Sequence, residues 1–273
     1  MAENQLGGLE MQTSPVRSEF SGAVARLQLD SPSNRNALSA AMLLALTQEI
    51  ERAQSDPQVR VIVLGHTGPA FCAGADLREQ TAGVAEGRPA PGVGALVPLF
   101  RLLLDCPKPV VCAVGGAVRA GGVGLVAACD IAIAAETATF ATGEVRLGLA
   151  PAVLSVVVLP KVGRSAAARL FLTGATLGAA EALAMGLVAH VVSEQELGAA
   201  VELVVSQLLL AHPNALATTK QILADVPGMR REAAFSAMAE LSAKLFVSSE
   251  ASEGMSAFLE RRPPNWVPPA GIS

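Results

Sequence analysis

Two glycine-rich stretches decide how this chain is expected to fold. Residues 71–77 read Phe-Cys-Ala-Gly-Ala-Asp-Leu, and residues 119–125 read Arg-Ala-Gly-Gly-Val-Gly-Leu. Each follows an apolar run of strand length, at 59–64 and at 110–114. A glycine at a strand-to-helix turn lets a ligand approach the backbone closely, and the N–H groups that open the next helix have no partner inside it. The sequence therefore predicts two turns whose N–H groups face one ligand oxygen.

The same glycines also fit a purely structural role in tight turns. Neither stretch has the Lys-Ser/Thr pair of a phosphate-binding loop or the G-x-G-x-x-G spacing of a dinucleotide site. Spacing alone therefore leaves both interpretations open.

Composition limits the class of protein. The 273 residues are 51% hydrophobic and only 3% aromatic, so one sizeable core built from Ala, Val and Leu is expected. A formal charge of -4 gives no electrostatic reason to expect nucleic acid or an anionic membrane as a partner. The four cysteines lack C-x-x-C spacing, no leader pattern opens the chain, and the apolar stretches are too short for a membrane span. We expect a reduced, cytoplasmic protein.

The chain divides by pattern into three parts. Residues 1–18 are polar and without period, which predicts a flexible tail, and 19–200 alternate strand and helix signals. Residues 201–273 are helical in pattern, so an α/β core with an appended helical region is expected. Ser39 is placed to cap a helix, and 80–94, rich in Gly, Pro and Ala, is typical of a mobile loop or lid. From 165 onward six helices are predicted, at 165–172, 177–185, 197–211, 213–224, 230–247 and 249–259.

Seven short motifs follow one another in the order of a known family. They are Asn36-Ala37-Leu38; 71–77; Gly121-Gly122 with Cys129-Asp130; Glu144 with Leu147-Gly148 and Pro151; Leu172-Thr173-Gly174; Ala180-Glu181-Ala182 with Gly186-Leu187-Val188; and Glu253-Gly254-Met255 with Ala257-Phe258-Leu259. By these motifs nearly the whole chain resembles the crotonase (enoyl-CoA hydratase/isomerase) superfamily. The resemblance implies an α/β spiral of ββα units and an acyl-CoA thioester substrate, with coenzyme A as part of the substrate and no separate cofactor or metal. It also implies homotrimers or hexamers built through the C-terminal helices.

The resemblance assigns roles to particular residues. It implies that the N–H groups of Ala73 and Gly121 form an oxyanion hole for the thioester oxygen, and that Glu144 is the acid/base. A further set is implied to line the substrate site: Arg35, Ala75, Asp76, Arg119, Gly122, Gly124 and Arg261.

One position departs from the family pattern. Hydratases resembling crotonase hold the attacking water between two glutamates, and the first of these positions is occupied here by Gly124. Glu144 alone is sufficient for a double-bond shift, whereas the stretch around it resembles bacterial hydratases of branched enoyl-CoA thioesters such as 3-methylglutaconyl-CoA. Three hypotheses follow: an enoyl-CoA hydratase, a 3-enoyl to 2-enoyl-CoA isomerase, and a crotonase-fold protein that binds acyl-CoA without chemistry.

Charged residues near the motifs could have a functional or a structural role. Arg119 could bind an acyl-chain carboxylate or a phosphate, or hold Glu144 ionised, or form a structural ion pair or subunit contact. Arg35 and Arg261 match places where relatives bind CoA phosphates, and both also fit ordinary surface charge. Asp76 is expected mainly to cap the following helix.

Cysteine and histidine chemistry is not favoured by the sequence. Cys72 has no cationic partner nearby in sequence, so we expect it to pack as a small apolar residue. No two of the three histidines have ligand spacing on one element.

Overall fold

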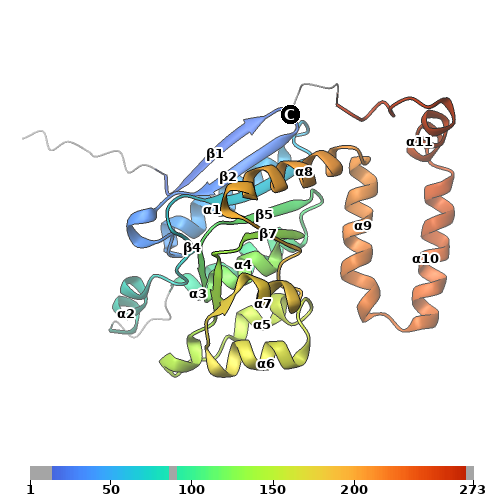
Figure 1. Cartoon of the computed structure of the whole chain (residues 1–273). Helices are drawn as coiled ribbons and strands as arrows, with labels where there is room; N and C mark the ends of the chain where they lie inside the picture. The colour runs from blue at the N-terminus through green and yellow to red at the C-terminus, as the bar shows by residue number, and fades with distance from the viewer. Residues whose placement is uncertain (1–13, 86–90, 269–273) are drawn as a thin grey trace, which may run out of the picture.

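The computed structural model describes residues 14–85 and 91–268 of the chain. Its strands form two sheets, with helices on both sides and a helical arm to one side (Figure 1). The six-stranded sheet has the order β1 (Val16–Ser21), β2 (Val24–Leu29), β3 (Val61–His66), β5 (Val110–Val114), β7 (Ile131–Ala135), β10 (His190–Val192). The four-stranded sheet has the order β4 (Ala70–Cys72), β6 (Ala117–Arg119), β8 (Thr139–Ala141), β9 (Leu177–Gly178).

From β3 to β8, successive strands alternate between the two sheets. β3, β5 and β7 are parallel neighbours in the six-stranded sheet, and β4, β6 and β8 are parallel neighbours in the four-stranded sheet. Each pair of strands, one from each sheet, is followed by a helix, so the chain advances by one strand position with every ββα unit. The predicted α/β class with repeated strand, turn and helix is confirmed.

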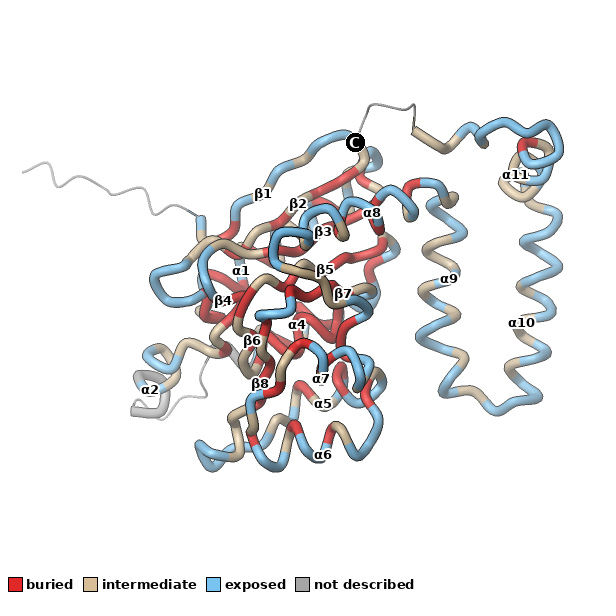
Figure 2. Tube along the Cα trace, in the orientation of Figure 1, coloured by how far each residue is buried: buried red, intermediate tan, exposed pale blue. Residues whose placement is uncertain are grey.

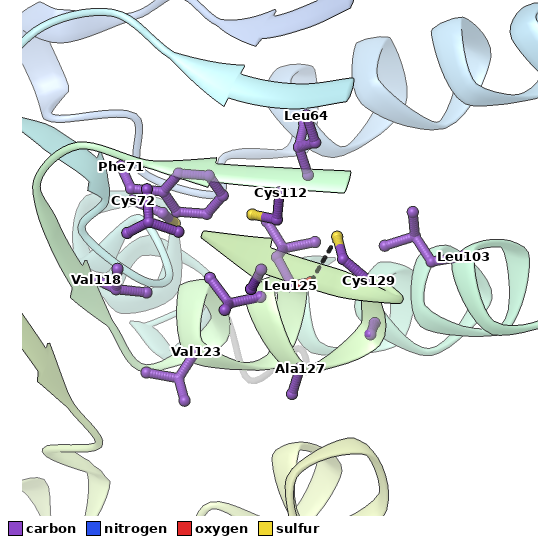
Figure 3. Packing of buried hydrophobic residues seen from close by; sticks show 14 of the residues in the cluster. Leu64, Phe71, Cys72, Leu103, Cys112, Val118, Val123, Leu125, Ala127 and Cys129 are labelled. Carbon is purple, nitrogen blue, oxygen red and sulfur yellow. Dashed lines mark hydrogen bonds between the residues drawn. The ribbon is translucent and has the colours of Figure 1, made fainter. Parts of the chain in front are cut away.

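The central strands are apolar on both faces because both faces are covered. On β3, Ile62 and Leu64 belong to the main core, whereas Val61 and Val63 face a second cluster with residues of α8. Parallel strands buried on two sides have this near-continuous Val and Ile character. Figure 3 shows Leu64, Cys112 and Leu125 packed together on the main-core side.

The helices are short, and several match the predicted ranges closely. Ser39 caps α1 as expected, since its side-chain oxygen accepts a hydrogen bond from Met42 N at 3.2 Å. The α-helices are α1 (Ala40–Ser55), α2 (Leu77–Ala85), α3 (Pro91–Leu104), α4 (Gly121–Ala128), α5 (Ala152–Val158), α6 (Arg164–Thr173), α7 (Ala179–Ala184), α8 (Leu197–Leu209), α9 (Pro213–Asp225), α10 (Arg231–Phe246) and α11 (Ser249–Glu260). Short 3-10 helices include η2 (Glu144–Leu147).

The last three helices form an arm beside the core. α9 and α10 contain no buried residue and α11 buries only Ala257, which Figure 2 shows as pale blue and tan helices next to a red core. Lys220, in the middle of α9, links the arm to the core: its ammonium donates to Asp130 at 2.7 Å and to Lys108 O at 3.0 Å.

Three predicted boundaries are wrong in the structure. The predicted tail over 1–18 ends earlier, because β1 begins at Val16 and pairs with β2; residues 1–13 lie outside the described part. The core extends past 200, since α8 buries Val201, Val204 and Leu209 against the six-stranded sheet. The predicted loop over 80–94 is mostly helix, in α2 and the start of α3, and 86–90 lie outside the described residues.

Within 14–85 and 91–268, no single helix is long and apolar enough to cross a membrane. The stretches Glu194–Leu209 and Pro213–Gly228 have the length and composition for this only together, as a pair bent by 106°.

Candidate functional site

Three neighbouring parallel strands carry the predicted site at one edge. β4, β6 and β8 run side by side, with Ala117 opposite Ala70 and Thr139, and Arg119 opposite Ala141. The carboxyl ends of neighbouring parallel strands, spaced about 4.8 Å apart, meet at the same edge of a sheet. The two glycine turns and Glu144 each follow one of these strands, so the sheet brings them together.

The two glycine turns pack directly against each other. A Cβ atom on Gly74 would lie 2.9 Å from Ala120 Cβ, and one on Gly122 would lie 2.7 Å from Cys72 Cβ. Gly74 also has a φ of +90°, which side chains rarely adopt. Because a Cβ atom at position 122 would come this close to Cys72, the contact between the two turns requires glycine there. Burial raises the pKa of the Cys72 thiol to about 12, in agreement with the predicted packing role.

The backbone N–H groups of the first turn are not all free. The N–H of Ala73, predicted as an oxyanion-hole donor, donates to Arg35 O at 3.0 Å in this structure. The parallel bridge between Leu38 and Ala75 includes a bond from Leu38 N to Gly74 O at 2.8 Å. The N–H of Ala75 itself makes no bond in this bridge. Among the described residues, the N–H of Ala75 has no acceptor.

The second turn opens α4 with a strained residue. Ala120 has φ 45° and ψ -117°, a region that favours glycine, and it is held there by bonds from its N–H to Ala141 O at 2.9 Å and from Val123 N to its carbonyl at 2.8 Å. The next N–H, that of Gly121, starts the helix and has no acceptor within 14–85 and 91–268. Two unpaired N–H groups, from Ala75 and Gly121, thus lie on adjacent turns.

Glu144 follows the third strand and opens η2. Its side chain is half-buried, and its Oε2 atom is buried without a hydrogen-bond partner among the described residues. Burial raises the pKa of this carboxyl above its ordinary value, because the charged form loses solvation. A buried, unpaired carboxylate oxygen is costly for folding, so its presence points to a function.

Hydrogen bonds on either side hold the segment that carries Glu144. Thr142, fully buried, donates its hydroxyl to Leu170 O at 2.8 Å, and the Arg146 guanidinium donates to Thr173 O from Nε at 3.1 Å and from Nη2 at 3.0 Å. Both acceptors are carbonyls in the last turn of α6, which lack partners within that helix. The Glu144 segment is therefore fixed to the C-terminal end of α6.

The position of the absent first glutamate, Gly124, is closed by its neighbours. A Cβ atom on Gly124 would lie 2.4 Å from Phe100 Cζ and 2.8 Å from Leu154 Cδ2, so no larger side chain fits there without movement of α3 or α5. Apolar side chains thus fill the position of the missing glutamate, in agreement with the single carboxylate, Glu144, that the sequence predicts for this site.

Arg119 does not contact Glu144. Its guanidinium donates to Val118 O at 2.9 Å, to Thr139 O at 2.9 Å and to Thr139 Oγ1 at 3.0 Å. All three acceptors are neutral, so the expected ion pair is not found among the described residues and Arg119 does not hold Glu144 ionised. Asp76 behaves as predicted: its carboxylate accepts a bond from Arg78 N at 3.0 Å at the start of α2.

The two predicted phosphate-binding arginines lie in different places. Arg35 is exposed next to the first glycine turn, with φ 58°. Arg261 ends α11 in the arm, away from α4 and the site strands of the same chain (Figure 1). The structure therefore brings Arg35, but not Arg261, to this site.

Sequence reasoning missed two neighbours of the site, Thr142 and Phe100. The spacing of four between Leu96 and Phe100 could have indicated that they share a helix face. Which helix that face meets depends on tertiary packing, and so does the partner of Thr142.

Comparison with known proteins shows which family the chain resembles. The model of the family "Enoyl-CoA hydratase/isomerase" matches residues 19–268. A solved enoyl-CoA hydratase from Mycobacterium avium is 43% identical with a TM-score of 0.70, and covers 93% of this chain and 99% of its own. One from Shewanella pealeana is 32% identical with a TM-score of 0.87, over 93% and 97%. Enoyl-CoA hydratase EchA19 of Mycobacterium tuberculosis is 34% identical over 256 residues, 91% of this chain and 94% of that protein.

The fold of alternating ββα units and the edge site define a crotonase-type α/β protein. The chain belongs to the enoyl-CoA hydratase/isomerase family. The resemblance read from the seven motifs is confirmed.

Proposed function

We propose that this protein is an enoyl-CoA hydratase with Glu144 as its single acid/base. The observation that carries the proposal is the buried Glu144 Oε2, which has no hydrogen-bond partner among the described residues. Burial raises the pKa of this carboxyl above its ordinary value, which favours its accepting and returning a proton during turnover. The hydratase names of the relatives support the same reaction.

Two backbone donors would stabilise the charge that develops in this reaction. We assign the thioester oxygen to the N–H groups of Ala75 and Gly121, which have no acceptors among the described residues. The helix that starts at Gly121 directs the positive end of its dipole to the same place. An enolate oxygen would be stabilised more than a neutral carbonyl, which lowers the barrier.

The addition of water then needs only one protein group. Glu144 accepts a proton from water while the water oxygen bonds to C3, and the double-bond electrons move through C2 onto the thioester oxygen. The Glu144 carboxylic acid returns the proton to C2 as the carbonyl re-forms. One water molecule is added, and Glu144 ends ionised as it began.

Binding and assembly follow from two further surfaces. Arg35, exposed beside the first glycine turn, is proposed to face a phosphate of coenzyme A. The arm exposes Phe235, Phe246 and Phe258, and apolar surface of this kind supports association of copies into a homotrimer or hexamer.

A second candidate is a 3-enoyl to 2-enoyl-CoA isomerase. The closed position at Gly124 favours it, because a double-bond shift needs no second carboxylate to orient water. In that reaction Glu144 would remove a proton from C2 and return it to C4.

The test is a parallel assay of wild type, Glu144→Gln and Glu136→Gln on 2-enoyl, 3-enoyl and carboxylated branched enoyl-CoA thioesters. Glu136 is an exposed carboxylate at the end of β7 and serves as the matched control. We expect Glu144→Gln to lower kcat for hydration by about 10²–10⁴-fold, the usual contribution of an acid/base, with the control unchanged. Undiminished hydration by Glu144→Gln would refute the mechanism, and turnover of only the 3-enoyl thioester would establish the isomerase.

A further inference from the structure

Helix α3 packs against the start of α4, and side chains of α3 lie next to glycines of α4. A Cβ atom on Gly121 would lie 3.6 Å from Leu96 Cδ1, and one on Gly124 would lie 2.4 Å from Phe100 Cζ. Leu96 and Phe100 are four residues apart on α3, and the two glycines are three apart on α4, so each pair shares a helix face. Phe100 therefore stands one helical turn beyond the N–H group proposed to bind the thioester oxygen.

Phe100 also forms the wall of a groove between α3 and α5. The groove has a volume of 380 Å³, and apart from Arg101 its lining is apolar, with Val97, Leu104, Val153 and Val156 beside the Phe100 ring. The ring itself is only 3% exposed. Phe100 thus contacts both the Gly124 face of α4 and the groove.

The acyl chain would run toward this ring. The two side chains closest to Gly124, one turn of α4 after Gly121, are Phe100 and Leu154, so an acyl chain that runs from Gly121 along α4 would meet them. Both walls are apolar, and no cationic side chain is among the atoms nearest to Gly124. An uncharged acyl group suits this wall better than one ending in a carboxylate.

We propose that Phe100 is a specificity-determining residue that limits the acyl group to a short, uncharged chain by separating the site from the groove between α3 and α5. This inference rests on the proposed function, because it takes the thioester oxygen to lie at Gly121. Replacement of Phe100 by a small residue joins the groove to the site. Each methylene group that then becomes buried adds roughly a fourfold gain in affinity.

The experiment measures chain-length profiles of Phe100→Ala, Phe100→Leu and the control Val156→Ala. Val156 lines the same groove, is 69% exposed, and is not among the side chains closest to Gly124. Calorimetry gives affinities for butyryl-, hexanoyl-, octanoyl- and decanoyl-CoA, and kcat/KM is measured on the matching 2-enoyl thioesters. Thermal melting confirms that each variant is folded.

We expect the affinity of wild type and of Val156→Ala to stop rising beyond about six carbons, and that of Phe100→Ala to keep rising to ten, by roughly fourfold per carbon. Phe100→Leu retains more apolar volume, so it serves as the second variant if Phe100→Ala does not fold. It should extend the chain-length profile by about one or two carbons. Equal losses for all chain lengths, or no change of profile in either variant, would overturn the proposal. Because saturated thioesters report binding without turnover, a failure of the hydratase assay leaves this test decisive.

Discussion

The core and the C-terminal arm both carry large apolar side chains but bury them very differently. In the core, strands such as β3 are buried on both faces, and even the glycines at 74, 122 and 124 are in tight contact with neighbours. In the arm, α9 and α10 bury nothing, and Phe258 on α11 is 82% exposed. Apolar surface that stays in water within one chain is free to be buried by another. The comparison teaches that packing within the chain supports the site, whereas the arm leaves apolar surface exposed, which is where we propose that copies of the chain associate.

The largest expected effect comes from a charge in the arm. Phe235→Glu places a carboxylate on α10 where 67% of the side chain is exposed, and burying that charge at a contact between copies is strongly unfavourable. We expect association to weaken by about 10³-fold or more, a cost of about 4 kcal/mol. Light scattering after size exclusion should show the mass of one chain.

Phe235→Leu is the matched control, because it keeps the surface apolar. Circular dichroism should be the same for both variants, since the core does not depend on Phe235. An unchanged mass for the glutamate variant would mean that this face of the arm is not a contact between copies.

The next effect concerns a residue that positions the base. Thr142→Val keeps the shape of the side chain but removes the bond to Leu170 O, so the Glu144 segment loses one of its ties to α6. Small misplacement of a reacting group is costly, and we expect kcat to fall by about tenfold with KM nearly unchanged. Steady-state kinetics over pH would also show a displaced acidic limb.

Thr142→Ser restores the hydroxyl and should restore both kcat and the pH profile. If the valine and serine variants are equally active, Thr142 serves only the stability of the fold.

Alanine substitution of one glycine in the core and one in the arm compares how tightly the two regions are packed. Gly124→Ala puts a Cβ atom 2.4 Å from Phe100 Cζ, and overpacking of this kind destabilises by about 1–3 kcal/mol. Gly228→Ala, in the arm, meets nothing within 4 Å and should stabilise by about 0.4–1 kcal/mol through the unfolded chain. Urea unfolding measures both; a change of the same sign at the two sites would contradict the difference in packing.

The smallest effect is the pH dependence of stability at Glu144. Burial raises the folded-state pKa of this carboxyl above its ordinary value of 4.5, so the folded state binds the proton more tightly than the unfolded state does. Stability from this group is complete below the unfolded pKa and is lost as pH rises through the folded pKa. Glu144→Gln should therefore melt at the wild-type temperature near pH 4 and above it at neutral pH. A melting-temperature difference that does not change with pH would exclude a perturbed carboxyl.

Local patterns predicted much of the fold. The strand at 110–114 and the helices from 197 onward were readable because each depends on periodicity, caps and breakers close in sequence. The start of β1 was missed because Val16 is buried by pairing with β2, and the polar residues around it give no period. The extent of the core was underestimated because α8 reads like the arm helices, and only its place on the sheet sets it apart.

The site was predicted at the level of segments but not of atoms. Both glycine turns and Glu144 meet at one sheet edge, as the order of elements required. The choice between Ala73 and Ala75 depends on which N–H donates to Arg35 O, a contact across 38 residues of chain that no local pattern encodes. The filling of the Gly124 position by Phe100 is likewise a matter of how two helices cross.

The four cysteines, all free and all buried, provide a built-in reporter. Cys72, Cys112 and Cys129 lie in the packed interior seen in Figure 3, and Cys106 is part of the same core cluster. A thiol-specific reagent reacts with the thiolate and needs access to it, so labelling has to wait until the core opens. The rate of labelling would thus report how often the packed interior around these thiols opens. The loosening of the fold can in this way be followed through the protein's own cysteines, without introducing a label site by mutation.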